Sequence, residues 1–361
     1  MSSEIGKRLK VSVFGQSHGK AIGVNIDGLP SGEPIDMEEL MRFMARRRPG
    51  KDAVSTARSE QDVPIFLSGV LDGLTCASPL CAIIQNNDTR SADYSELFDT
   101  PRPSHADYTA RVKWGGAADM RGGGHFSGRM TAPLCIAGGI AKQLLSRRGI
   151  FIGAHLASVG TVSDSLFPLR LEEQLFDEIA LKAFPVIDDE KGRLMQEAIL
   201  AAAAASDSVG GAIECAAVGL PVGLGEPMFD SIENRLAAAV FGIPAVKGIE
   251  FGAGFACTAM KGSECNDQFC IDERGDIATE TNNSGGILGG ITNGMPLVFR
   301  VAIKPTPSIG REQTTVSLSR MEQTKIKIRG RHDPCIAHRA VPVLEAVTAV
   351  VILDLLLEEG M

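Results

Sequence analysis

Apolar and polar residues alternate along the chain with two different periods, and these periods predict its secondary structure. Apolar residues return every three or four positions between Met37 and Arg48, which predicts a helix. Asp36 and Glu39 have the spacing of a capping box, and Pro49 with Gly50 ends the pattern. The same periodicity predicts four further helices, over about 131–148, 192–205, 231–241 and 340–358.

Short apolar runs bounded by turn residues predict more strands than helices. We expect strands at 9–14, 23–26, 65–70, 80–85, 150–157, 212–218, 248–251, 297–303 and 325–328. The strands do not alternate strictly with helices, which disfavours a doubly wound parallel sheet and favours an α+β fold. No repeat or Pro/Ser-rich linker divides the chain, so we expect one continuous unit. The acidic segment 171–190 is the only plausible insertion or surface excursion.

Composition narrows the class of protein. Of 361 residues, 44% are hydrophobic, which is ample for a core, and a charged share of 22% argues against wholesale disorder. A net charge of −8 and only 5% aromatic residues disfavour a nucleic-acid binder. The uncharged stretch 281–299 is rich in Asn and Gly, which favours loop and buried strand over a membrane span. With no signal-peptide pattern and no CxxC pair among eight cysteines, we expect a cytoplasmic protein without a metal site.

Three loops in the first third of the chain carry candidate chemistry. The loop at 15–19 follows a strand, and its His18 either donates a proton or is simply hydrogen-bonded in a hairpin turn. Three consecutive arginines at 46–48 exceed what the dipole of one helix needs, so we expect at least one to face an anion. In the loop 102–108, His105 and Asp107 form either an acid/base pair or part of an ordered surface loop.

Three later loops are rich in glycine, in basic residues or in both. The segment 121–129 places three glycines between Arg121 and Arg129 just before a helix, which favours anion binding but matches no Walker loop or dinucleotide fingerprint. The glycines of 282–290 suggest close approach to a flat ligand or to another backbone, or a β-bulge. The stiff polar loop 304–308 follows. The basic cluster 329–339 is either a charged turn capping the last helix or part of a site.

In this order the six loops resemble those of chorismate synthases. The matching motifs are G-Q-S-H-G at 15–19, R-R-R-P-G at 46–50, R-P-S-H-A-D-Y-T at 102–109, R-G-G-G at 121–124, G-G-I-L-G-G-I at 285–291, K-P-T at 304–306 and R-H-D-P-C at 331–335. They span nearly the whole chain, and together they are very specific. The resemblance implies one catalytic domain over 1–361, folded as a β-α-β sandwich with central helices between two antiparallel sheets, and a homotetramer.

The resemblance also implies a reaction in the shikimate pathway of aromatic amino acid biosynthesis. Members of the family convert 5-enolpyruvylshikimate 3-phosphate to chorismate and phosphate by a 1,4-anti elimination. They require reduced FMN although the reaction involves no net redox change. An otherwise acidic chain would have to concentrate its basic loops around these anionic ligands, and the flavin would carry the hardest chemistry.

Roles carry over by position. His18 is expected to protonate the departing phosphate, His105 to protonate or stabilise the reduced flavin, and Asp333 to help deprotonate it. Ser17 and Ser127 are expected to assist through hydrogen bonds. The positions expected to clamp substrate anions are Arg47, Arg48, Arg129 and Arg331. The positions expected to contact the flavin are His125, Phe126, Ser127, Ala245, Gly289, Lys304, Pro305, Thr306, Pro307, Ser308 and Arg331.

The chain departs from the family pattern at several of these loops. Many members have Glu where this chain has Gln16, Arg-Ser at 125–126, and Asn where it has Pro244. A common arginine of the family is Ala53 here, with Arg58 the nearest alternative.

Two other functions stay open: a flavin-dependent oxidoreductase on the same scaffold, and a non-enzymatic anion-binding protein. Reduced flavin would come from an external reductase or from NAD(P)H used by this chain, in which no separate NAD(P)H domain is visible.

Overall fold

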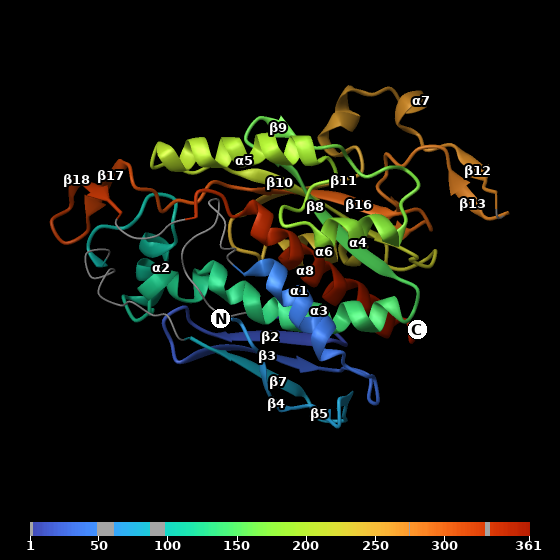
Figure 1. Cartoon of the computed structure of the whole chain (residues 1–361), viewed down its shortest axis with the longest axis horizontal. Coiled ribbons are helices and arrows are strands. Elements are labelled where there is room, and N and C mark those ends of the chain that lie inside the picture. The colour runs from blue at the N-terminus through green and yellow to red at the C-terminus, as the bar shows by residue number, and fades with distance from the viewer. Residues whose placement is uncertain (1–2, 49–60, 87–97, 274, 329–332) are drawn as a thin grey trace.

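A computed structural model describes residues 3–48, 61–86, 98–273, 275–328 and 333–361 (Figure 1). Two five-stranded antiparallel sheets dominate it, with strand orders β1-β2-β3-β7-β4 and β11-β16-β10-β8-β9. Long helices run between and around the sheets (Figure 1). The strands are antiparallel and helices are not interleaved with them one by one, so the α+β prediction is confirmed.

The first sheet carries the N-terminal candidate loop at one end. Its strands are β1 Glu4–Ile5, β2 Lys10–Gly15, β3 Ala21–Asp27, β4 Ile65–Ser68 and β7 Leu80–Gln85. A small hairpin, β5 Val70–Leu71 and β6 Leu74–Thr75, extends from it. Pairing of Gly15 with Ile22 closes the β2–β3 hairpin, and the loop with Ser17 and His18 lies at this closed end. Strand β7 ends beside the same loop, since Ala21 pairs with Gln85.

The second sheet is formed by β8 Phe151–Val159, β9 Val162–Ser163, β10 Gly211–Val218, β11 Val246–Phe251 and β16 Leu297–Ile303. Three two-stranded hairpins lie outside it: β12 Phe269–Ile271 with β13 Ile277–Thr279, β14 Ile287–Leu288 with β15 Ile291–Thr292, and β17 Glu312–Ser317 with β18 Glu322–Lys327. Strand β11 begins directly after residue 245 and strand β16 ends directly before residue 304. Because Val246 pairs with Ile303, the two loops lie together.

Helices connect the two sheets. The α-helices are α1 Met37–Arg47, α2 Asp107–Trp114, α3 Thr131–Ser146, α4 Glu173–Leu181, α5 Asp189–Ala204, α6 Ile232–Val240, α7 Gly262–Cys265 and α8 Ala337–Glu358. Helix α3 packs on β3 and β7 of the first sheet, α8 packs on β8 and β10 of the second, and the two helices pack on each other. A Cβ on Gly138 would lie 2.2 Å from the Cα of Ala346, so glycine is what allows this close approach.

Helix α8 is the one helix in the described chain that is long and apolar enough to cross a membrane, with a mean hydropathy of 2.3. However, 89% of its apolar window is buried inside the protein. It lies between α1, α3 and the second sheet (Figure 1) and joins residues of both sheets into one apolar core. Its hydropathy therefore reflects its place in the core.

All five predicted helices and all nine predicted strands are present, with ends shifted by a few residues. Strands β7 and β16 begin and end where predicted. The Asp36 side chain caps α1 by accepting from the backbone of Glu38 and Glu39. The prediction that 171–190 is an insertion or surface excursion is wrong. This segment contains α4, which packs on β8 and buries Phe176 and Ile179, so its acidic residues mark only the outer face of a packed helix.

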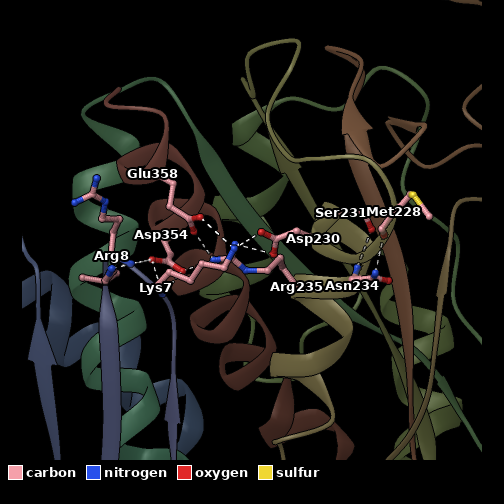
Figure 2. Close-up of polar contacts among 10 residues, drawn as sticks. Lys7, Arg8, Met228, Asp230, Ser231, Asn234, Arg235, Asp354 and Glu358 are labelled. Carbon is pink, nitrogen blue, oxygen red and sulfur yellow. Dashed lines mark hydrogen bonds and ion pairs between the residues drawn. The ribbon is translucent and has the colours of Figure 1, made fainter.

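A buried carboxylate connects the two ends of the chain (Figure 2). Asp354 of α8 is 1% exposed and accepts hydrogen bonds from the backbone N–H groups of Lys7, Arg8 and Leu9, at 2.7–3.1 Å. It also accepts from Arg235 of α6, which pairs with Glu358 as well. The carboxylate therefore joins the segment before β2 to two helices.

We expect Asp354→Asn to lower the free energy of unfolding by about 3–5 kcal/mol, because the new N–H₂ group would face the Arg235 guanidinium in a buried site. Urea denaturation followed by circular dichroism measures the loss. Glu358→Gln is the matched control, since Glu358 pairs with the same arginine but is partly exposed, and it is expected to cost less than about 1 kcal/mol. Equal losses in both variants would contradict the assigned role of Asp354.

Candidate active site

The glycine segment 122–124 separates two of the predicted catalytic histidines. It belongs to a short 3₁₀ stretch, η2 Arg121–Phe126, in which all three glycines have positive φ angles of 55–87°. A Cβ on Gly122 would lie 2.2 Å from Nδ1 of His18, and one on Gly123 would lie 3.4 Å from Nε2 of His105. The first, third and fourth candidate loops therefore meet here, although about a hundred residues separate the first from the others.

His18 is held against this glycine segment by its neighbour. Ser17 is completely buried; its backbone N–H donates to the carbonyl of Gly124 at 3.1 Å, and its Oγ lies 3.3 Å from Nδ1 of His18. His18 itself is half-buried. Because Ser17 has no exposed surface, its hydroxyl can influence a ligand only through His18. The arrangement leaves the imidazole as the group that can exchange a proton with a ligand.

His105 belongs to a compact charged group at the start of α2. Its Nδ1 lies 2.7 Å from Oδ1 of Asp107, and Arg102 donates to the same carboxylate through Nε and Nη2, both at 2.7 Å. Burial opposes ionisation of Asp107, but hydrogen bonds from Arg102 and His105 outweigh it and hold the pKa of the carboxyl far below its usual range. An ionised Asp107 orients the ring so that Nε2 faces Gly123.

The loop 304–308 packs beside His105. The Lys304 ammonium donates to the carbonyl of Ser104 at 2.5 Å, and Ser308 accepts from Arg102 at 3.2 Å. The Lys304 backbone N–H donates to the carbonyl of Ala245, a residue with a positive φ of 74°. Three of the predicted flavin contacts, from segments 60 residues apart, thus lie together next to the predicted catalytic histidine.

Two of the predicted substrate arginines meet at a carboxylate that the sequence did not single out. Asp62 accepts hydrogen bonds from Arg47 through one oxygen and from Arg129 through the other. Burial alone would raise the pKa of the Asp62 carboxyl, but the two guanidiniums outweigh it and lower that pKa. Arg46 likewise pairs with Glu345, so the anions that Arg46 and Arg47 contact among the described residues are carboxylates of the protein itself.

Asp333 lies at the end of α1. Arg339 donates to its carboxylate at 2.8 Å and to the backbone carbonyl of Arg47 at 3.1 Å. The sixth candidate loop is therefore joined to the second. Arg48 caps α1, and its Nε is buried without a hydrogen-bond partner among the described residues. Arg331, together with Ala53 and Arg58, lies outside the described residues.

His125 anchors the glycine segment. Its Nδ1 lies 2.8 Å from the carbonyl oxygen of Gly15, and its Nε2 lies 2.9 Å from Oγ of Ser3. Both ring nitrogens are therefore engaged within the protein. Phe126 is partly exposed and its ring lies 5.8 Å from that of Trp114. Ser127 begins the next 3₁₀ turn, η3 Gly128–Met130, by accepting from the Arg129 backbone N–H at 3.2 Å.

Gly289 is not joined to this cluster by any hydrogen bond among the described residues. It lies at the tip of the β14–β15 hairpin, where a Cβ would meet no atom within 4 Å. The neighbouring glycines do approach other backbone segments: a Cβ on Gly285 would lie 2.5 Å from the backbone nitrogen of Gly252, and one on Gly290 2.5 Å from the Glu226 carbonyl. Of the alternatives for 282–290, close backbone approach applies to these two and to Gly286, where a Cβ would lie 2.5 Å from the Pro296 carbonyl oxygen.

Sequence reasoning missed Asp62 and Asn86, which contact the predicted site residues directly. Asn86 directly follows β7, accepts from Nε of Arg129 at 3.1 Å and donates to the carbonyls of Gln16 and Gly19. Neither residue belongs to a glycine-rich or basic motif. The only sequence signal was that each is a polar residue next to a predicted strand, which describes many surface residues equally well.

Comparisons with protein families, sequences and solved structures all identify chorismate synthases as similar proteins. The family model described as chorismate synthase matches residues 9–357. A chorismate synthase of Thermococcus kodakarensis is 48% identical over 99% of both chains, and one of Methanosarcina barkeri is 45% identical over 98% of this chain and 96% of its own. A solved crystal structure of chorismate synthase superposes with a TM-score of 0.76 and 27% identity, covering 98% of this chain and 93% of the other.

Proposed function

The chain belongs to the chorismate synthase family, and from this premise we propose that the cluster around Gly122 and Gly123 is where the substrate loses its phosphate. The protein is a lyase that converts 5-enolpyruvylshikimate 3-phosphate to chorismate and phosphate in the shikimate pathway, with a requirement for reduced FMN. The single observation that supports the location is the convergence of His18 and His105 on one glycine segment, with Arg129 joined through Asn86 to the loop of His18.

The residues near His105 suit an anionic flavin. Burial, together with the nearby Lys247, lowers the pKa of the Lys304 ammonium. A bound phosphate would offset the repulsion between the two ammonium groups. We propose that Lys304 to Ser308 and Ala245 hold the FMN, with Gly289, Phe126 and Ser127 as further contacts. His125, whose ring nitrogens contact Ser3 and Gly15, would act by holding the glycine segment. When bound there, reduced FMN would supply an electron transiently to ease departure of the phosphate and would recover it within the same turnover, so that no net redox change results.

Side chains of the protein would carry out the proton transfers and bind the substrate. His18 would give a proton to the departing phosphate oxygen, with Ser17 orienting its Nδ1. Arg47, Arg48, Arg129 and Arg331 would bind the substrate's anionic groups, since guanidinium pairs well with both carboxylate and phosphate. His105, oriented by Asp107, would keep a proton on the flavin side, and Asp333, held by Arg339, would accept one.

Several wider properties are part of the same proposal. One apolar core contains residues from both sheets, which supports a single catalytic domain over 1–361. Packing of α3 on one sheet and α8 on the other supports the β-α-β sandwich expected from the family. A homotetramer and a cytoplasmic location complete the proposal, with reduced flavin supplied either by an external reductase or by NAD(P)H that this chain uses itself.

Anaerobic turnover tests this function. We expect purified protein, mixed with reduced FMN and 5-enolpyruvylshikimate 3-phosphate, to release many phosphates per protein while the flavin absorbance stays that of the reduced form. Protein without flavin is the control and should release none. Oxidation of one flavin for each phosphate released would instead show a flavin-dependent oxidoreductase, the alternative function for this scaffold.

A further inference from the structure

We propose that Asp62 and Asn86 are positioning residues that together set the substrate arginines against the loop of His18. The inference rests on the proposed function of Arg47, Arg129 and His18. The structure shows an unbroken chain of hydrogen bonds running from Arg47 through Asp62, Arg129 and Asn86 to the backbone on both sides of His18.

Asp62 makes one unit of two arginines from different elements. Arg47 ends α1 and Arg129 lies in η3, and the three side chains are only 0–6% exposed. Two guanidiniums at this spacing would repel each other without a shared anion, and burial would strengthen the repulsion. The carboxylate keeps them side by side. In addition, Nε of Arg47 is buried without a hydrogen-bond partner among the described residues.

Asn86 then fixes the distance between this pair and His18. Its Oδ1 accepts from Nε of Arg129 at 3.1 Å, while its Nδ2 donates to the carbonyls of Gln16 at 3.1 Å and Gly19 at 2.9 Å. The reversed amide would place oxygen against two carbonyls and nitrogen against a guanidinium, so only this orientation satisfies every group. An amide is the side chain that can accept on one side and donate twice on the other.

This spacing matters for the proposed reaction. The departing phosphate must be bound by an arginine and protonated by His18 at the same time, and a misplacement of about 1 Å can cost about 10² in rate. Neither Asp62 nor Asn86 needs to touch the substrate for this. They act through Arg47, Arg129 and the 16–19 backbone, which makes them positioning residues.

The chain offers a matched control in Glu345 of α8. Glu345 also bridges two cations, the partly buried Arg46 and Lys142, at 2.6 and 2.5 Å. Arg46 directly precedes Arg47, but its partner belongs to α8, away from the His18 loop. A carboxylate-to-amide change at Glu345 therefore disrupts a similar group of ion pairs without contacting the proposed site.

The experiment compares Asp62→Asn, Asn86→Asp and Glu345→Gln in the full chain. An amide at 62 can accept from only one arginine, so we expect KM for 5-enolpyruvylshikimate 3-phosphate to rise at least tenfold while kcat falls less than threefold. A carboxylate at 86 still accepts from Arg129 but repels the carbonyls of Gln16 and Gly19. We therefore expect Asn86→Asp to lower kcat at least tenfold with a smaller change in KM.

Glu345→Gln is expected to lower Tm while leaving both constants within about twofold of wild type. Constants within threefold of wild type in a folded Asp62→Asn or Asn86→Asp protein would overturn the proposal, as would the same kinetic losses in Glu345→Gln. A lower KM in Asp62→Asn would show that Asp62 competes with the substrate instead. If Asp62→Asn does not fold, Asn86→Asp decides alone. The Kd for the substrate, measured by calorimetry without flavin, tests the positioning roles separately from the proposed reaction. It can be measured even if the wild-type protein releases no phosphate.

Discussion

Replacing His18 with alanine is expected to slow anaerobic phosphate release by about 10²- to 10⁴-fold, the range typical for loss of a positioned proton donor. The imidazole lies against Gly122, and Ser17, which orients it, is completely buried. No other described side chain is expected to take its place on that side of the glycine segment. Because Arg47 and Arg129 remain, calorimetric affinity for the substrate should change less than about threefold.

His105→Ala is the companion variant, and a loss of the same order is expected from the opposite side of the glycine segment. Its partner Asp107 would remain paired with Arg102, so the loop should keep its structure. Comparable circular dichroism spectra and Tm values would verify this. Turnover within threefold of wild type in both histidine variants would show that the proposed roles are wrong.

Gly122→Ala is expected to reduce kcat by about 10²-fold without removing any catalytic group, because a displaced proton donor is nearly as damaging as a missing one. The added Cβ would lie 2.2 Å from both Cε1 and Nδ1 of His18 and 2.8 Å from Oγ of Ser17. Something must move, and the half-buried His18 ring is the group best able to do so. Steady-state phosphate release at saturating substrate measures the effect.

Positive φ adds strain of its own at this position, and Gly149→Ala separates that strain from displacement of His18. Gly149 has φ of 74°, close to the 60° of Gly122, but a Cβ there would meet nothing within 4 Å. We expect Gly149→Ala to lose about 1–2 kcal/mol of stability from the left-handed conformation while keeping its turnover. If the two alanine variants have similar kcat values, contact with His18 is not what requires glycine at 122.

Features that depend on residues close together in the chain were predictable from the sequence, when the pattern was long enough to see. Periodicity located α1, β7 and β16 to within a residue, because burial of one face repeats along the segment itself. The same reasoning failed at 171–190, where a high acidic content obscured the two buried positions of α4. The hairpins β12–β13 and β14–β15 were also missed, since strands of two or three residues are too short to show a period.

The candidate site likewise contains residues that the sequence could identify and residues that it could not. Loops that combine glycine, arginine and histidine stand out in sequence because they are rare in purely structural turns. The resemblance to the chorismate synthase family then selected Arg47, His18, His105 and Arg129 within them without coordinates. Asp62 and Asn86 could not, because nothing near them in sequence distinguishes them. His125 was assigned to the flavin by position, and the structure places both of its ring nitrogens against Ser3 and Gly15.

The sequence by itself determined most of the longer helices and strands, the α+β class and the set of glycine-rich and basic loops, because each depends on residues close together in the chain. Only the tertiary structure decided which loops meet and what holds them. The contacts of Asp62 with Arg129 and of Gly122 with His18 join residues 67 and 104 positions apart. They exist because α1 and α3 pack together and because β2 and β3 end beside the glycine segment. Local periodicity contains no information about such packing.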